Sequence, residues 1–163
     1  MRNDRALSNL WLPLGVSLES VRDGEATMDR ITSQARSTLM RRIKSNGTAP
    51  ELALRGALWA AGLRYRLRSK LPGKPDITFP AARVAVFVDG CFWHRCPIHG
   101  HVPKGNIGYW AKKLARNRER DLAANRALGE CGWLPMRVWE HEVTEDLASC
   151  VARISKAVQL RSQ

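Results

Sequence analysis

Residues 76–90 read DITFPAARVAVFVDG. The run 83–88 is nearly all β-branched or aromatic, which is typical of a strand buried at the centre of a sheet. Ile77–Phe79 predicts a second, shorter strand, and the Pro-Ala-Ala that follows it predicts a turn. An antiparallel pair joined by this turn would bring the carboxylates of Asp76 and Asp89 to one edge of the sheet.

Helical and strand patterns continue on both sides of this pair. Apolar residues recur at spacings of three and four over residues 31–43, Thr48 is a suitable N-cap for a second helix, and Glu51 lies near the positive end of its dipole. In chain order we expect a helix from residue 32 to Gly47, a helix at 50–61, a strand at 64–71, the central pair, a helix at 109–128, a strand at 133–139 and a helix capped by Thr144. This order predicts an α/β or α+β fold in which helices flank a mixed sheet.

The length of 163 residues corresponds to one domain, and a hydrophobic content of 44% is sufficient for a buried core. No apolar run reaches the roughly 18 residues that span a bilayer. Leu7–Leu18 follows two arginines, as in a signal peptide, but Asn9 and Pro13 interrupt it and no small-x-small cleavage site follows. We therefore expect a poorly ordered extension at 1–27, with an ordered packing arm as the alternative, and a folded domain at 28–163.

Basic residues outnumber acidic ones, with 27 Lys and Arg against 15 Asp and Glu and a formal net charge of +12. The extension at 1–27 has a net charge of −1, so the domain at 28–163 carries +13. Its basic residues concentrate in the helix expected before Gly47 and between Lys112 and Arg120. Such a surplus favours a polyanionic partner such as nucleic acid, although charge alone also fits a ribosomal protein or a membrane-surface protein.

Asp76 and Asp89 form the first candidate site. Two carboxylates at one sheet edge suit Mg²⁺, which prefers oxygen ligands and lets phosphate oxygens and water complete its shell. Such an ion activates water and stabilises charge on a phosphodiester, so the pair favours nuclease chemistry in a basic chain. Either residue alone would be interpreted as a turn or N-cap aspartate. His94 follows in the motif GCFWH as a candidate general base or acid, with zinc binding as its alternative role.

Residues 91–108 contain two Cys, three His, two Pro and three Gly, and a loop of this length in a small domain is usually functional. No secretion signal supports disulfides, and the spacing of Cys91, Cys96 and His99 is typical of a zinc site. The candidates for a fourth ligand are His101, Cys131, His141 and Cys150. We expect His141, because it ends the last predicted strand and would fix the loop to the sheet, whereas a buried thiol is the ordinary interpretation of Cys150.

Large aromatic residues occur in and after this loop. Phe92 and Trp93 are adjacent, and Trp110 begins the basic helix. Such side chains usually lie buried in the core. Two consecutive aromatics in a Gly-flanked loop are hard to bury together, however, and side chains of this kind wedge between the base steps of duplex DNA. The residues alone leave both interpretations open.

Five segments, in order, carry a resemblance to a known family: MDRITSQARSTLMRRIKSNGTAPELALR, LPGKPDITFP, VFVDGCFWHRCPIHGHVPK, YWAKKLARNRERD and GWLPMRVWEHE. They extend from about Met28 to Glu142 and resemble the very short patch repair (Vsr) endonucleases, which are related to the PD-(D/E)XK nucleases. The segment GCFWH with the following Cys and His is the most specific of them. The resemblance implies an α/β, restriction-endonuclease-like mixed β-sheet flanked by helices, with a structural zinc-bound loop.

Members of that family nick one strand of duplex DNA 5′ to the thymine of a T·G mismatch, which arises when 5-methylcytosine deaminates. The resemblance therefore implies a Mg²⁺-dependent, strand-nicking endodeoxyribonuclease that initiates very short patch repair. It further implies a cytoplasmic, bacterial-type monomer at the nucleoid, with mismatch-repair proteins and a repair polymerase as candidate partners. The alternatives are another PD-(D/E)XK-type nuclease of different specificity and a non-catalytic, zinc-stabilised DNA-binding protein.

The resemblance also assigns catalytic roles by motif position. Asp76 and Asp89 match positions that bind the magnesium ion, together with the carbonyl oxygen of Val88. His94 matches the general base, and Glu51 matches a glutamate near the metal-bound waters. The implied zinc ligands are Cys91, Cys96, His99 and, at a position where many members have Cys, His141.

A third group of positions matches residues that contact the mismatch. Three aromatics match side chains that intercalate beside the T·G pair, a methionine approaches from the N-terminal segment, and two polar helix residues face the mismatch. These are Phe92, Trp93 and Trp110, then Met40, and then Lys113 and Asn117. A wobble pair is less costly to unstack than a matched pair, so wedge insertion selects for it.

Overall fold

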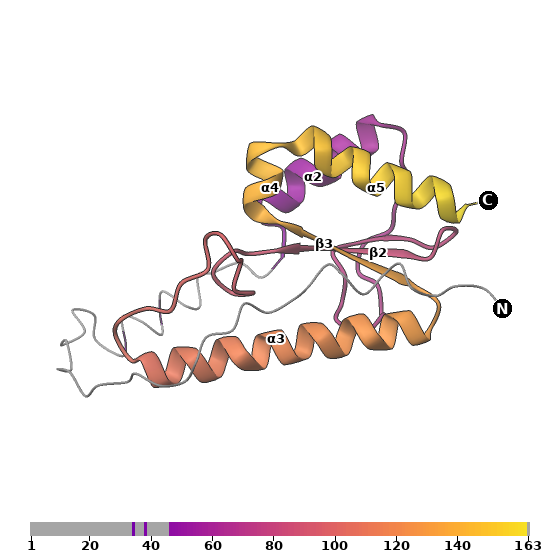
Figure 1. The fold of residues 1–163 in the computed structure, drawn as a ribbon. Helices are drawn as coiled ribbons and strands as arrows, with labels where there is room; N and C mark the ends of the chain where they lie inside the picture. The colour runs from indigo at the N-terminus through magenta and orange to yellow at the C-terminus, as the bar shows by residue number, and fades with distance from the viewer. Residues whose placement is uncertain (1–33, 35–37, 39–45, 163) are drawn as a thin grey trace.

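A computed structural model describes residues 34, 38 and 46–162 (Figure 1). The extension expected at 1–27, Met40 and nearly all of the helix expected at 32–47 lie outside the described residues. Among the helices that are described, none is long and apolar enough to cross a membrane. Helices cover both faces of a small mixed sheet, which confirms the predicted α/β class (Figure 1).

The sheet has three strands in the order β1 (Ile77–Phe79), β2 (Val84–Asp89) and β3 (Leu134–Trp139). β1 pairs with β2 in the antiparallel sense, and β3 pairs with β2 in parallel along its whole length. All residues of β2 except Val88 are buried. The apolar run therefore forms the central strand, as predicted, because only a central strand is covered on both faces and both edges.

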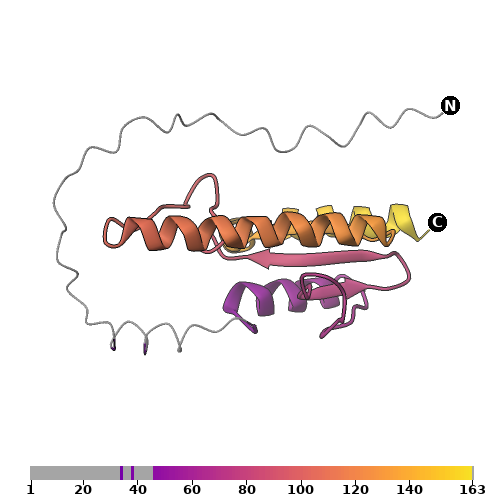
Figure 2. The same ribbon diagram turned by 90° about the horizontal axis from the view of Figure 1, so that it is seen from below.

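The helices form a layer on each side of the sheet. One face carries α2 (Ala49–Ala60), α4 (Glu140–Glu145) and α5 (Leu147–Arg161), and the other carries α3 (Ile107–Glu130) (Figure 1). α3 is two residues longer at each end than expected. It extends past the end of β2, on the side where the loop that follows β2 leaves the sheet (Figure 2).

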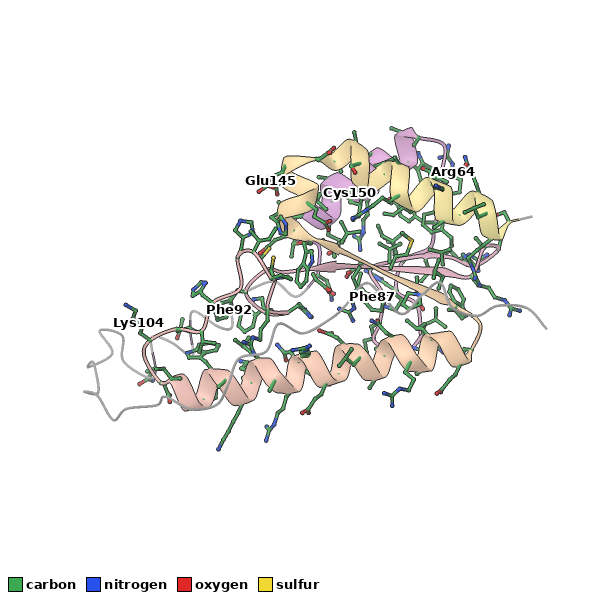
Figure 3. All side chains as sticks on the ribbon, viewed as in Figure 1. Arg64, Phe87, Phe92, Lys104, Glu145 and Cys150 are labelled. Carbon is green, nitrogen blue, oxygen red and sulfur yellow. The ribbon has the colours of Figure 1, made fainter. Side chains whose placement is uncertain are left out.

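The core divides according to the alternation of side chains along β2. Val84 and Val86 belong to the larger apolar cluster, together with the buried leucines of α2 and Ile154 of α5. Ala85 and Phe87 belong to a smaller cluster with Leu128 of α3, and Phe87 lies between the sheet and that helix (Figure 3). Each helical layer is thus held to the sheet by one face of the same strand.

The strand expected at 64–71 does not form. Within this segment Arg66 makes an isolated antiparallel bridge to Thr78 of β1, with two backbone hydrogen bonds of 2.8 and 2.9 Å. Arg68 has a left-handed φ of 55°, which interrupts an extended backbone. The basic residues of the segment are all exposed, so the alternation reflects solvated charges and not a half-buried strand.

The first residues of α2 and α5 show which of the expected N-caps form. Glu51 accepts a hydrogen bond from the Thr48 N–H (3.3 Å), which confirms that α2 begins after Thr48. Thr144 does not cap the last helix, because it lies within α4 and donates to the Glu140 carbonyl oxygen (2.8 Å). Asp146 is the cap of α5 and accepts from the Ser149 N–H (2.9 Å). A helix of six residues, such as α4, is too short to show helical periodicity in the sequence.

The turn that leads into β1 approaches α3 closely at Gly73. This residue has a left-handed φ of 74°, and a Cβ atom built on it would lie 2.7 Å from the Ala124 Cβ and 3.1 Å from the Phe87 ring. Glycine is therefore required there by both its backbone conformation and the space available. The contact fixes the path of the chain three residues before Asp76.

We expect Gly73→Ala to lower the free energy of unfolding by about 2–4 kcal/mol, because alanine is strained at this φ and its methyl group overlaps α3. Urea denaturation measures the change. Gly129→Ala is the matched control, since it lies in α3 with nothing within 4 Å of the added Cβ. The control should be neutral or slightly stabilising, and equal stability of both variants would contradict the close approach.

Candidate active site and metal centre

Asp76 lies immediately before β1 and is held against the end of β2. Its N–H donates to the Val86 carbonyl oxygen (3.0 Å), and its Oδ2 accepts from the Val88 N–H (2.8 Å). Asp89 is the last residue of β2. The antiparallel pairing thus brings the two aspartates to the same end of the strand pair, close enough for the charge of Asp89 to raise the pKa of Asp76.

The carboxyl group of Asp76 has an unusual environment. Its pKa is raised to about 6, mainly by burial and also by the nearby charge of Glu51, while the hydrogen bond from Val88 and the charge of Arg55 oppose this rise. No Lys, Arg or His side chain among the described residues lies within ion-pair distance of it. A buried carboxylate without a cationic partner is a natural ligand for a divalent metal ion.

Glu51 is 2% exposed and lies at the N-terminus of α2. Its Oε2 accepts from the Gly47 N–H (2.5 Å) and the Thr48 N–H, and its Oε1 forms an ion pair with Arg55. Arg55 also donates to the Asp76 carbonyl oxygen (3.3 Å). The glutamate therefore caps its helix and is neutralised by an arginine, while it remains close to Asp76.

His94 is oriented by a carboxylate that the sequence analysis did not identify. Its Nδ1 lies 2.6 Å from Oδ2 of Asp121, which is on α3. Burial alone would raise the pKa of Asp121, but its bonds to His94 and Arg137 hold that pKa below the ordinary value. The ionised carboxylate only accepts, so Nδ1 of His94 carries the hydrogen and Nε2 is left for proton transfer. Burial alone would lower the pKa of His94. The hydrogen bond to Asp121 and the charges of Asp89 and Asp121 outweigh burial, so this pKa is raised above its ordinary value.

Arg137 is the second residue that the sequence analysis missed. It lies in the middle of β3, and its Nη1 donates to both carboxylate oxygens of Asp89 (2.8 and 2.7 Å). Its Nη2 donates to Oδ1 of Asp121 (3.1 Å). A lone arginine within an otherwise apolar strand is the signal that would have indicated a buried acidic partner.

The four residues predicted to bind zinc are brought together. The ligand atoms of Cys91, Cys96, His99 and His141 all lie within 4.8 Å of one another. Nδ1 of His141 is 3.1 Å from the Cys91 sulfur and 3.6 Å from the Cys96 sulfur. His141 is the second residue of α4, not the end of a strand as expected. Two thiol and two imidazole groups in one small cluster form a donor set that suits a tetrahedral metal ion such as Zn²⁺.

The other candidates for a fourth ligand lie elsewhere. His101 contacts the Phe92 ring, with centroids 5.5 Å apart. Cys131 is exposed at the end of α3, and Cys150 is buried in the core between α5 and the sheet (Figure 3). This agrees with the expectation that His141 joins the cluster and that Cys150 is a buried thiol.

The three aromatic residues form one cluster between the loop and α3. The Phe92 ring centroid is 4.9 Å from that of Trp93 and 5.3 Å from that of Trp110, and Phe92 lies on the side of the loop that faces α3 (Figure 3). Phe92 and Trp93 are half-buried, whereas Trp110 is 6% exposed. In this structure Trp110 is thus a buried support for the other two rings.

Lys113 and Asn117 lie beside this cluster on α3. Nζ of Lys113 is 5.2 Å from the Trp93 ring centroid and 5.5 Å from that of Trp110. The Asn117 side chain is buried, donates to the Trp93 carbonyl oxygen (3.0 Å) and accepts from Arg120. A shallow pocket beside them is lined mainly by basic side chains, namely Lys112, Lys113, Arg116 and Arg120, together with Tyr109, Asn117 and Glu119. A surface of this charge attracts phosphates.

Comparisons with known proteins agree with one another. Residues 28–99 match the family described as DNA mismatch endonuclease Vsr. The chain is 49% identical over 122 residues to the Type II nicking enzyme V.NaeI of Lentzea aerocolonigenes, which covers 71% of this chain and 74% of that protein. It is 42% identical over 135 residues to the Type II nicking enzyme V.NmeDIP of Neisseria meningitidis serogroup C, covering 81% and 91%. It is 38% identical over 111 residues to the DNA mismatch endonuclease Vsr of Escherichia coli (strain K12), covering 64% and 69%.

We expect Asp76→Asn to stabilise the protein in magnesium-free buffer at pH 7.5. The folded-state pKa of Asp76, about 6, lies above the ordinary value of 3.8, so stability is lost as the pH rises from about 4 to 6 and the ionised carboxylate destabilises the fold by a constant amount above that. Asparagine is neutral at every pH and can still accept from Val88. The gain should be about 3 kcal/mol at pH 7.5, at about 1.4 kcal/mol per pKa unit, and should fall below about 1 kcal/mol at pH 4.

Urea denaturation at several pH values measures this dependence. Glu145→Gln is the matched control, because it removes the same charge from an exposed position of α4. The control should change stability by less than about 0.5 kcal/mol at any pH. A gain for Asp76→Asn that is the same at pH 4 and pH 7.5 would show that burial does not raise the pKa of Asp76.

Proposed function

Because the chain belongs to the Vsr family of DNA endonucleases, we propose that it nicks one strand of duplex DNA 5′ to the thymine of a T·G mismatch. Such a nick initiates very short patch repair of deaminated 5-methylcytosine. The observation that carries the proposal is that Phe92 and Trp93 directly precede His94 in one loop. A side chain that wedges into the duplex and a proton-transferring imidazole are therefore joined, and cleavage occurs beside the base step that opens.

The catalytic metal is assigned to Asp76 and the Val88 carbonyl oxygen. Asp76 supports this assignment because it is the buried carboxylate of the site that has no cationic partner among the described residues. The resemblance also assigns Asp89 to the ion, although both of its oxygens accept from Arg137. Mg²⁺ bound here would supply positive charge to the scissile phosphate and activate water. Glu51 adds negative charge beside this position.

The remaining chemistry belongs to His94 and Asp121. His94 acts as the general base through Nε2, since Asp121 occupies Nδ1. Asp121 fixes the ring and stabilises the imidazolium that forms when the proton arrives, as a carboxylate does for a catalytic histidine in other hydrolases. Together with His94, Arg137 lowers the pKa of Asp121, which favours the ionised, accepting carboxylate.

A structural Zn²⁺ is assigned to Cys91, Cys96, His99 and His141. The cluster joins both ends of the short segment that contains His94 to the start of α4. A metal bound there would fix a loop that otherwise has little regular structure, and with it the histidine and the two aromatic side chains. The role of the zinc is thus to hold the recognition and cleavage groups in one arrangement.

DNA is held by the basic face of α3, with Lys113 and Asn117 nearest the aromatic cluster. Met40 keeps its assigned role only as an inference from the resemblance, because it lies outside the described residues. We assign residues 28–163 to the nuclease domain. We also propose that the protein is a monomer that acts at the nucleoid, in the cytoplasm. Mismatch-repair proteins and a repair polymerase would act on the nick.

A nicking enzyme of another specificity is the second candidate. Two of the relatives described above carry the name Type II nicking enzyme. That name refers to strand cleavage and does not mention a mismatch. The two candidates share the same metal and histidine chemistry and differ only in the step at which the duplex is recognised.

Synthetic duplexes that differ at one base pair separate these candidates. With Mg²⁺ we expect a single cut 5′ to the mismatched thymine, roughly ten- to a hundredfold faster than in the matched C·G duplex, the factor that a few kcal/mol of easier unstacking supplies. Denaturing gels map the cut in several flanking sequences. Chelation of Mg²⁺ should stop it.

Two results would go against the proposal. Equal cutting of matched and mismatched duplexes would remove the repair assignment and leave a nicking enzyme of other specificity. Asp76→Asn should bind T·G duplex like the parent protein without cutting it, so a variant that nicks as fast as the parent would remove Asp76 from the mechanism.

Metal analysis of variants tests the zinc assignment. The purified protein should contain one equivalent of zinc per chain, and Cys96→Ser and His141→Ala should lose it and melt at a lower temperature. His141→Cys should retain the metal, because a shell of three Cys and one His also binds zinc. His101→Ala and Cys131→Ser are the controls and should retain it as well. Zinc in the His141→Ala protein at the parent level would contradict the assignment.

A further inference from the structure

We propose that Arg137 is a positioning residue of the nuclease, and that Asp89 serves as its buried counter-ion and not as a metal ligand. Through Asp121, Arg137 fixes the orientation of His94. This inference rests on the proposed function only in taking His94 as the general base. It revises the assignment that the family resemblance gives to Asp89.

The contacts of Arg137 leave none of its three nitrogens free. Nη1 donates to both oxygens of Asp89, Nη2 donates to Asp121, and Nε donates to Oδ1 of Asn125 (3.2 Å). The guanidinium also stacks on the Phe87 ring, with its central carbon 4.6 Å from the ring centroid. A planar group held at every nitrogen and on one face has a single orientation available to it.

Asp121 transmits this orientation to the histidine. One of its oxygens accepts from Arg137 (3.1 Å) and the other accepts from His94 (2.6 Å). A carboxylate that is bound at both oxygens cannot rotate without breaking one of the two bonds. The position of the His94 ring is therefore set from the middle of β3, a strand that supplies no group to the reaction itself.

Asp89 is the more deeply buried of the two carboxylates that Arg137 binds. It is 3% exposed, and Arg137 carries one positive charge for the two carboxylates of Asp89 and Asp121. A cation on Asp89 would have to displace the guanidinium or lie next to it, and like charges repel strongly at that distance in a buried site. Asp76, in contrast, has no ion pair with an arginine among the residues that the structure describes. Asp76 is thus left for the metal, whereas Asp89 and Asp121 both bind the arginine.

The experiment compares Arg137→Met, Asp89→Asn, the double variant and Arg137→Lys. The matched control is Arg153→Met, which removes an arginine from the Glu142–Arg153 ion pair between α4 and α5. Melting curves first establish which variants are folded. Arg137→Lys retains the charge but lacks the planar fork that donates in three fixed directions, so this variant provides the test if Arg137→Met does not fold.

Three readouts are compared. Nicking is measured at saturating DNA and Mg²⁺ on the duplex that the parent protein cuts fastest. Metal affinity is measured by calorimetric titration of Mn²⁺ into the zinc-loaded protein. The tautomer of His94 is read from its imidazole ¹⁵N chemical shifts at a pH where the ring is neutral, which reports the position of the hydrogen and requires no substrate.

We expect Arg137→Met and Asp89→Asn to lower the nicking rate roughly ten- to a hundredfold, the usual cost of losing a group that orients a catalytic residue. The double variant should be no slower than either single variant, because the two residues act as one unit. Arg137→Lys should recover part of the rate. Affinities for Mn²⁺ and DNA should not change, and the His94 spectrum should change from one tautomer to an average of two. Arg153→Met should match the parent protein in every readout.

Two outcomes would overturn the inference. An Asp89→Asn protein that binds Mn²⁺ tenfold more weakly, while Arg137→Met binds it as well as the parent or better, would make Asp89 a metal ligand that Arg137 restrains. An Arg137→Met protein with the parent rate and the parent His94 spectrum would remove the positioning role. If the parent protein nicks no duplex, the proposed function fails, and the His94 spectra alone then decide the positioning role.

Discussion

The backbone pairing of β1 with β2 is the constraint on which the rest of the structure depends. β2 is buried on both faces, so its N–H and carbonyl groups need partners on both edges, and β1 and β3 supply them. The pairing continues one residue beyond β1, where Asp76 bonds to Val86 through its backbone and to Val88 through its side chain. The carboxylate of Asp76 is thereby fixed in position, at the point where the sheet ends and the functional loop begins.

Charge balance around this point follows from the same architecture. Two arginines bind three of the four carboxylates that cluster among the described residues, since Arg55 pairs with Glu51 and Arg137 bridges Asp89 and Asp121. Both arginines come from elements that pack directly against the strand pair, α2 on one face and β3 at one edge. Asp76 is the carboxylate of this group without an ion pair among the described residues, so excess negative charge lies at the proposed metal position, and the basic surface of α3 suits phosphates.

Much of this arrangement could be predicted from the sequence, for physical reasons that also explain the failures. The apolar run 83–88, the cap at Thr48 and the four Cys and His residues of the metal cluster depend on local pattern or on ligand chemistry, and each was predicted. The segment 64–71 alternates like a strand but has exposed charges and a left-handed Arg68. Arg137 and Asp121 were missed because their partners are 48 and 27 residues away in the chain, and no local pattern records such pairs.

The junction between β3 and α4 has a consequence for the synthesis of the protein. Arg137 holds the two aspartates, Glu140 accepts from the Cys91 N–H (2.7 Å), and His141 completes the metal cluster. A chain that ends before this junction retains the contacts of Asp76 with Val88 and of His94 with Asp121, but it lacks the arginine that binds Asp121 and the fourth residue of the metal cluster. A prematurely terminated chain therefore contains the groups of the site without the contacts that hold them in one arrangement.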